Sequence, residues 1–157
     1  MLTTIQEFIA SLPEVLQLLG VALAGAIPFV ESYLGSALGI VVGVTPVAAV
    51  IAAIIGNILS MLIVVLAAHG VRSRVKTSAA PSPQSPRRAK LKQRFDRYGV
   101  PGVSLLGQTL LPSQITSAAM VSFGASKNQV ILWQIISIIL WGVLFGVLAT
   151  LGVSVVR

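Results

Sequence analysis

Two long apolar segments dominate the pattern of hydrophobic and polar positions along this chain. One covers residues 47–68 and the other runs from about residue 128 to residue 155, and neither contains a charged residue. Twenty-two helical residues reach about 33 Å, which is enough to cross the roughly 30 Å hydrocarbon core of a bilayer. Thr45 suits an N-cap and Pro46 a first helical position. The pattern therefore predicts a transmembrane helix in each segment.

Two further apolar stretches, residues 13–45 and 100–125, are interrupted by Gly and Pro, with Pro28 in the first and Pro112 in the second. Broken helices at membrane depth are tolerated only where protein or water satisfies the backbone. We expect each stretch to form a re-entrant helical hairpin, with its turn at residues 28–35 or near residues 111–116. A single spanning helix with a proline kink is the alternative for each.

The two halves of the chain share one order, in which a broken hairpin is followed by Gly-x-(Thr/Ser) and then by an unbroken helix. Gly43 and Thr45 carry this signature in the first half, and Gly124 and Ser126 carry it in the second. Pro28 matches Pro112 in this scheme.

Orientation follows from the basic region between the halves. Nine of the eleven Lys and Arg residues lie between Arg72 and Arg97, and the positive-inside rule places residues 71–97 in the cytoplasm. The first transmembrane helix (46–69) then runs inward and the second (126–157) runs outward, which makes the repeats inverted. Inverted repeats with broken helices are a recurrent design of transporters.

Composition supports a multi-pass protein of the cytoplasmic membrane, with residues 1–157 as a single all-α membrane domain. Hydrophobic residues make up 55% of the chain and charged residues 10%, against about 25% charged in soluble domains, and the mean hydropathy is +0.95. Residues 1–12 are a lead-in to the first hairpin (13–45), and residues 70–86 are a disordered cytoplasmic linker.

Residues 87–99 combine cations with Leu91, Phe95 and Tyr98 at helical spacing. This pattern predicts a basic interfacial helix lying on anionic lipid headgroups. Because topology accounts for the net charge of +7, nucleic acid is not an expected partner. The side chains expected to contact lipid are Lys92, Arg94 and Arg97.

Glu31 is the acid within an apolar region that runs from residue 15 to residue 68. Acids at membrane depth are costly and often mark a transport pathway, so Glu31 is expected to carry a proton or to contact a cationic group. Alternatively, the turn reaches the headgroup layer and Glu31 is hydrated. The other residues of the predicted pathway are Pro28, Asn57, Gln108, Pro112, Ser113, Gln114 and Thr116. The amide and hydroxyl groups among them have a second interpretation, which is that they satisfy the broken backbone.

The residue types that the sequence lacks argue against a disulfide, a metal site and an enzyme active site. The chain has no Cys and one His, His69, so neither a disulfide nor a metal site is expected, and no cofactor is implied. One membrane acid and one His provide no recognisable pair of nucleophile and base. The chain is therefore not expected to be an enzyme.

Over about residues 14–150 the chain resembles the small multidrug-export protein family, which is similar to the DedA/VTT superfamily of membrane proteins. The motifs that carry the resemblance are Ala26-Ile27-Pro28 with Glu31, Gly56-Asn57, Arg94-Phe95-Asp96-Arg97-Tyr98-Gly99, and Leu111-Pro112-Ser113-Gln114-Ile115-Thr116-Ser117-Ala118.

The resemblance implies that two re-entrant hairpins face each other, that Glu31 and the turn around Pro112 line a central site, and that the protein has a transport role. Members of the wider superfamily are associated with lipid translocation or scrambling and with proton-linked tolerance phenotypes. Members of the DedA group typically carry arginines beside the proline of the second hairpin. Here Gln108 and Gln114 are nearby instead, so phosphate recognition by this hairpin is not implied.

The expected function is that of a transporter or flippase-like protein for a lipid or an amphiphilic small molecule. The alternative is a non-transporting membrane subunit that assembles with a partner membrane protein and stabilises it. Gly142 and Gly146 have the G-x-x-x-G spacing that permits close helix approach. This spacing could serve a homodimer or such a partner.

Overall fold

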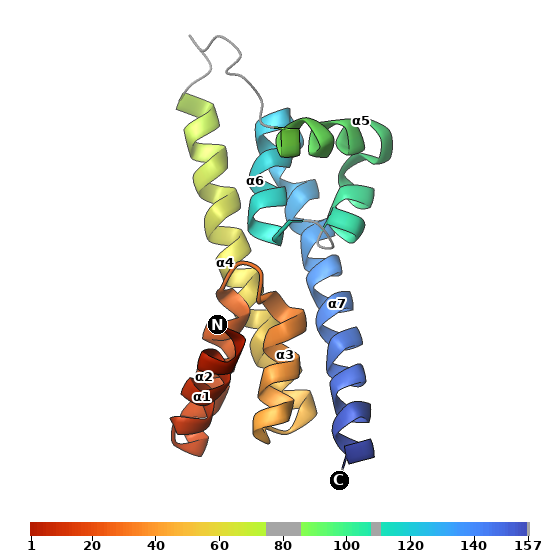
Figure 1. Cartoon of the computed structure of the whole chain (residues 1–157). Helices are drawn as coiled ribbons and strands as arrows, with labels where there is room; N and C mark the ends of the chain where they lie inside the picture. Colours follow the sequence, from red (N-terminus) through yellow and green to blue (C-terminus); the bar gives the residue numbers. More distant parts are fainter. Residues whose placement is uncertain (75–85, 108–110, 157) are drawn as a thin grey trace. The chain divides into compact units, whose positions relative to one another are not determined.

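The computed structural model describes residues 1–74, 86–107 and 111–156, whose regular secondary structure is entirely α-helical (Figure 1). The predicted disordered linker falls largely on residues 75–85, and Gln108 belongs to residues 108–110, so both lie outside the described residues. The helices are α1 (Leu2–Ser11), α2 (Glu14–Ala26), α3 (Glu31–Val42), α4 (Pro46–Arg74), α5 (Pro86–Gly107), α6 (Ser113–Phe123) and α7 (Lys127–Val156).

Two of these helices are long and apolar enough to cross a membrane. The relevant stretches are Pro46–Val71 of α4 and Lys127–Val155 of α7, which confirms the predicted all-α fold with two long apolar helices. α4 begins at Pro46, as its fixed φ and missing N–H favour. The apolar helices α2 and α3 have 13 and 12 residues, fewer than the roughly 20 that a full span needs.

The two long helices start from junctions that have the same conformation. α3 ends at Gly43 with φ 109°, and α6 ends at Gly124 with φ 114°, a left-handed region that glycine enters without steric cost. The N–H of the next residue, Val44 or Ala125, donates to a carbonyl five residues back over 3.0 Å in both cases. This is the Schellman arrangement, which satisfies carbonyls at a helix end. The Gly-x-(Thr/Ser) signature thus has one structure in both halves.

The turn of the first hairpin is shorter than predicted. We expected it at residues 28–35, but α3 already begins at Glu31, so the turn is residues 27–30. Gly35 was interpreted as a helix breaker, whereas it lies inside α3 at a point of close contact. A Cβ there would lie 3.1 Å from the Cα of Gly25 in α2. Residue 35 is therefore glycine because α2 lies too close to leave room for a side chain.

The chain forms two compact units. Unit 1 comprises Met1–Ser60 and Ile138–Arg157, and unit 2 comprises Met61–Ser137. Unit 1 therefore contains α1, α2, α3, the beginning of α4 and the end of α7. Unit 2 contains α5, α6, the end of α4 and the beginning of α7.

Unit 1 is built on close contacts at small residues. α2 and α3 pack against each other, and α1 packs on both. A Cβ at Gly56 of α4 would overlap the carbonyl of Ala22 in α2, and one at Gly25 of α2 would overlap the carbonyl of Ala53 in α4. Between apolar helices that gain little from hydrophobic burial, such close backbone approach is a main source of association.

The glycines of the G-x-x-x-G motif in α7 are also used inside unit 1. A Cβ at Gly142 would lie 2.8 Å from Ile54 of α4 and 3.1 Å from Ser32 of α3, and one at Gly146 would overlap the side chain of Val50. The spacing that was considered for a dimer therefore serves contacts of α7 with α3 and α4 of the same chain.

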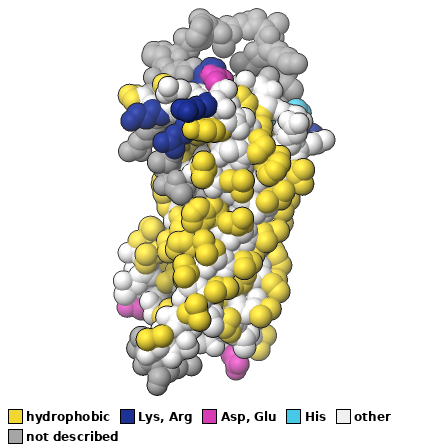
Figure 2. Space-filling view, turned by 90° about the vertical axis from the view of Figure 1, so that its right-hand side faces the viewer, with side chains coloured by type: hydrophobic (Ala, Val, Ile, Leu, Met, Phe, Trp, Pro, Cys, Tyr) yellow, Lys and Arg dark blue, Asp and Glu magenta, His cyan; other side chains and the backbone are white. Residues whose placement is uncertain are grey.

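Unit 2 contains α5, which packs on α6, and the rings of Phe95 and Phe123 join the two helices at a centroid distance of 5.8 Å. α5 bends at Gly99, where the predicted interfacial helix was expected to end. We call residues 86–98 its first arm and residues 100–107 its second arm. Figure 2 shows Lys and Arg side chains gathered in one group, with hydrophobic side chains over much of the same face.

The contact between Gly56 and Ala22 predicts a strong effect of one added carbon. Gly56→Ala should lower the free energy of unfolding by about 1–3 kcal/mol or more, because the new methyl group forces two backbones apart. Gly70→Ala on the same helix is the matched control, since a Cβ there meets nothing within 4 Å. Thermal unfolding of the purified protein in detergent measures both. Equal stability of the two variants would contradict the close approach.

Candidate functional site

Glu31 is fully buried in unit 1, and its backbone is in an unusual conformation. Its side chain has 0% exposure, and its φ is 53°, in the left-handed region. Phe29, two residues earlier, has φ 72°. Such angles cost an L-residue about 1–2 kcal/mol, and backbone strain of this kind clusters at functional sites. The turn thus holds a carboxylate in the interior by means of a costly backbone conformation.

At a turn that faces water, polar side chains are usually exposed and apolar ones buried. Around this turn the exposure of polar and apolar side chains is largely reversed. Ile27 is 38% exposed and Phe29 is 56% exposed, whereas Glu31 and Ser32 are completely buried. Pro28, which was predicted to line the pathway, is exposed with its apolar neighbours. The exposed side chains of the turn are therefore apolar, whereas the first two polar side chains of α3 are buried beside Val30.

Hydrogen bonds anchor the serines that follow Glu31. Ser32 Oγ donates to the carbonyl of Ile138 in α7 over 2.9 Å, and Ser36 Oγ donates to the carbonyl of Ser32 over 2.6 Å. The ring of Tyr33 packs edge-on against Phe145 at a centroid distance of 5.3 Å. α3 is thus fixed to α7 immediately after the acid.

Asn57 is also fully buried in unit 1. It follows Gly56, the residue at which α4 touches α2, so the closest crossing of these helices positions it. The structure therefore places Glu31 and Asn57, both predicted pathway residues, in the interior of the same unit.

In unit 2, the second hairpin carries a cluster of buried polar groups without a formal charge. Ser113, Gln114 and Thr116 are at most 3% exposed, and Pro112 is buried as the N-cap of α6. Thr116 Oγ1 donates to the carbonyl of Ser113 over 3.1 Å. The part of the predicted pathway that lies on α6 is therefore brought together, and part of its hydrogen bonding satisfies the start of the helix.

Four members of this cluster were not among the predicted pathway residues, namely Ser104 on α5, Ser117 on α6, and Gln134 and Ser137 on α7, all fully buried. Gln134 Nε2 donates to Thr116 Oγ1 over 3.1 Å, and Ser137 Oγ donates to the carbonyl of Ser104 over 2.7 Å. The signal was the spacing of Gln134 and Ser137, three residues apart on one face of an apolar helix.

The cluster of unit 2 retains unused hydrogen-bonding capacity. Within the described part of the chain, Gln134 Oε1, Ser104 Oγ and Ser117 Oγ are buried without a hydrogen-bond partner. Buried polar atoms without a partner are costly, and each requires an explanation such as a water or a ligand. These atoms lie on three different helices of unit 2 and give its interior two hydroxyl groups and one amide carbonyl with hydrogen-bonding capacity but no charge.

The three cations predicted to contact lipid lie on the first arm of α5 and have different neighbours. Lys92 Nζ is 2.9 Å from Asp96 Oδ2 one helical turn away, and both side chains are about half exposed. The Arg97 guanidinium lies 5.2 Å from the centroid of the Tyr98 ring. Arg94 is exposed and lines a pocket beside the bend of α5.

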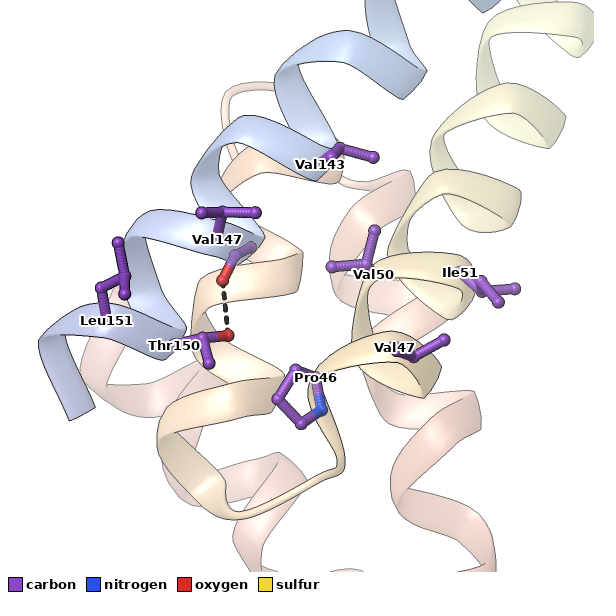
Figure 3. A pocket seen from close by; sticks show the side chains of 9 residues that line it. Pro46, Val47, Val50, Ile51, Val143, Val147, Thr150 and Leu151 are labelled. Atoms are coloured by element: carbon purple, nitrogen blue, oxygen red, sulfur yellow. Dashed lines mark hydrogen bonds between the residues drawn. The ribbon is translucent and has the colours of Figure 1, made fainter. Parts of the chain in front are cut away.

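A separate groove in unit 1 lies between the first turns of α4 and the last turns of α7 (Figure 3). Its volume is about 420 Å³. Thr150 is its one hydroxyl-bearing residue, and Thr150 Oγ1 donates to the carbonyl of Gly146 over 2.8 Å. The groove therefore has little to orient a polar ligand.

The described residues contain no group of three or more His, Cys, Asp or Glu residues that could hold a metal ion. Comparison of the chain with protein-family models, with curated proteins and with solved structures gave no match.

The left-handed backbone of Glu31 predicts an inverted order of stability for two substitutions. In a helix, Ala is normally more stable than Gly by about 1 kcal/mol. At residue 31, Glu31→Gly should be the more stable by about 1 kcal/mol, because glycine adopts positive φ without steric cost. Denaturant unfolding in detergent measures the difference.

Glu14 provides the matched comparison. It is exposed and is the first residue of α2, and it is not among the described non-glycine residues with positive φ. Glu14→Ala should therefore be at least as stable as Glu14→Gly. The same order at both positions would show that Glu31 is not held in a left-handed conformation.

Proposed function

We propose that this chain is an integral protein of the cytoplasmic membrane that moves a lipid or another amphiphile across the bilayer. In this proposal α4 and α7 span the membrane, the α2–α3 hairpin and the hairpin formed by the second arm of α5 with α6 enter it and return, and the first arm of α5 lies at the surface. The observation that carries the proposal is the inverted burial at the α2–α3 turn, where Ile27 and Phe29 are exposed and Glu31 is buried. Hydrocarbon outside and polar groups inside is the distribution that lipid surroundings favour.

The second support is a repeat of burial along the two halves. Gly43 and Gly124 lie 81 residues apart, and buried residues recur at this spacing on both sides of the junctions. In this register Pro112 corresponds to Glu31, whereas the sequence had suggested Pro28. The matching buried pairs are Ser32 with Ser113, Ser36 with Ser117, Gly39 with Met120, Ile40 with Val121, Ala49 with Val130, Ala53 with Gln134 and Gly56 with Ser137.

Such a repeat is expected if the halves are copies of one hairpin-and-helix element. The basic first arm of α5 favours a cytoplasmic position for the region between them. With one spanning helix in each copy, the copies then enter the membrane from opposite sides. Inverted repeats of this kind bring broken helices from both sides toward the midplane, where transporters bind their substrates.

The two hairpins carry different chemistry. The first carries the carboxyl group of Glu31, and the second carries neutral hydroxyl groups such as those of Ser117 and of Thr116, which accepts a hydrogen bond from Gln134 of α7. No Lys, Arg, Asp or Glu lies between residues 98 and 126. A carboxylate attracts cations and repels anions, so a cationic or neutral amphiphile suits a hairpin that carries Glu31 better than an anionic one.

The alternative function, a non-transporting subunit, drew on the G-x-x-x-G motif of α7. Gly142 and Gly146 pack against Ile54 and Val50 within the chain. The motif is thereby accounted for without a partner, and transport remains the function that the geometry favours.

Reconstitution in liposomes tests the proposal. Protein-containing vesicles should move a fluorescent lipid or a cationic amphipathic dye faster than protein-free vesicles. Glu31→Gln should lower that rate about tenfold or more, because a hydrogen bond to a charged group is worth about 1.5–3 kcal/mol and 1.4 kcal/mol corresponds to a factor of ten. An anionic dye of similar size should cross more slowly.

Glu14→Gln is the control, since it removes an exposed carboxylate from α2 and should leave the rate within about twofold. The proposal fails if protein-containing and empty vesicles give equal rates with every probe. Equal rates for the wild type and Glu31→Gln would remove Glu31 from the mechanism.

A further inference from the structure

The bend of α5 is fixed by its own sequence. Gly99 has φ 65° and ψ −167°, a combination that is essentially confined to glycine. Gly102 lies against Tyr98 so closely that a Cβ at residue 102 would overlap the Cβ of Tyr98. Since both positions require glycine, the angle between the first and second arms of α5 is a built feature of unit 2.

A pocket of about 350 Å³ lies beside this bend and is lined by both arms. Leu91 and Val103 are 4% and 3% exposed and provide an apolar floor. Arg94 and Tyr98 bring a guanidinium and a phenol from the first arm, and Leu106 brings an exposed apolar side chain from the second. The pocket thus has a polar side and an apolar side.

Of the described cations of the first arm, Arg94 is the one best placed to bind a ligand in this pocket. Lys92 is engaged with Asp96, and Arg97 is stacked on Tyr98. Lys90 is exposed and does not line the pocket. Arg94 lines the pocket, and no ion pair is found for it among the described residues. One guanidinium with one adjacent phenol matches a single oxyanion.

We call the pocket beside the bend of α5, lined by Arg94, Tyr98 and Leu106 among others, the elbow pocket. We propose that it binds the phosphate diester headgroup of an anionic phospholipid. Arg94 donates two hydrogen bonds to the phosphate oxygens, Tyr98 donates a third, and the first methylenes of an acyl chain lie against Leu106. A volume of about 350 Å³ is at the lower end of ligand pockets, so it holds the headgroup region and leaves the rest of the lipid in the bilayer. The proposal uses the membrane location in the proposed function and does not depend on transport.

The site differs from general attraction to an anionic surface. Surface attraction depends on the number of cations near the bilayer and falls with ionic strength. Binding in the elbow pocket depends on Arg94 in particular, because among the cations whose side chains are described Arg94 alone lines the pocket with the phenol of Tyr98 and the apolar floor. Variants that remove one charge at different positions therefore separate the two effects.

The experiment measures lipid retention by native mass spectrometry of the full chain. The protein is placed in nanodiscs of a zwitterionic phospholipid doped with an anionic one, and the anionic lipids kept after release into detergent are counted. The wild type should retain one anionic lipid. Arg94→Gln should lower its affinity about tenfold, the effect of one lost charge-assisted pair. Lys90→Gln, which changes the net charge equally, should retain the lipid as the wild type does.

A second pair of measurements identifies the source of the phosphate. Leu106→Gln should weaken lipid retention severalfold, and millimolar inorganic phosphate should not displace the lipid. Displacement by phosphate together with normal retention by Leu106→Gln would assign the pocket to the free anion and overturn the proposal. Equal losses in Arg94→Gln and Lys90→Gln would reduce the effect to surface charge. All readouts concern binding, so failure of the transport assay would leave them interpretable.

Discussion

The crossing of α2 and α4 is the contact on which unit 1 depends. Gly25 lies on the carbonyl of Ala53, and Gly56 lies on the carbonyl of Ala22, with no room for a Cβ at either glycine. In the membrane location that we propose, helices gain little from hydrophobic burial, so packing at backbone distance would have to hold them together. This crossing brings Asn57 into the interior, and the matching contacts of Gly142 and Gly146 bring α7 against α3, where Ile138 accepts the hydrogen bond from Ser32.

The helices of unit 2 are held together by a different kind of contact. At the position corresponding to Gly56 it has Ser137, whose hydroxyl donates to the carbonyl of Ser104 on α5. Directed polar contacts thus replace close backbone contacts, and atoms such as Gln134 Oε1 keep capacity for further hydrogen bonds. Unit 2, which has no charged residue between residues 98 and 126, therefore contains more buried neutral polar side chains than unit 1.

Hydropathy was sufficient to predict the long helices, because span length and the absence of charge are properties of the sequence alone. The positions of glycine in the sequence also located the bend at Gly99 and the junctions at Gly43 and Gly124, because these turns need a residue that adopts positive φ. Prediction from the sequence was incomplete where a contact between helices determines the role of a residue. The turn was predicted to reach Gly35, which instead lies inside α3 and serves its packing on α2, and the exposure of Pro28 could not be read from hydropathy. Gln134 and Ser137 escaped notice because their role appears only when α5 and α6 lie against α7.

The contact between Gly56 and Ala22 also constrains how far this sequence can diverge. Many positions of α4 are exposed, such as Val47, Ile51 and Ile63, and these accept any apolar side chain of suitable size, so their identity carries little historical information. The position of Gly56 admits no side chain at all, and the same holds for Gly25 on the facing helix. Distant relatives of this architecture should therefore be recognisable by the spacing of these glycines relative to the acid of the turn, long after the surrounding residues have lost detectable similarity.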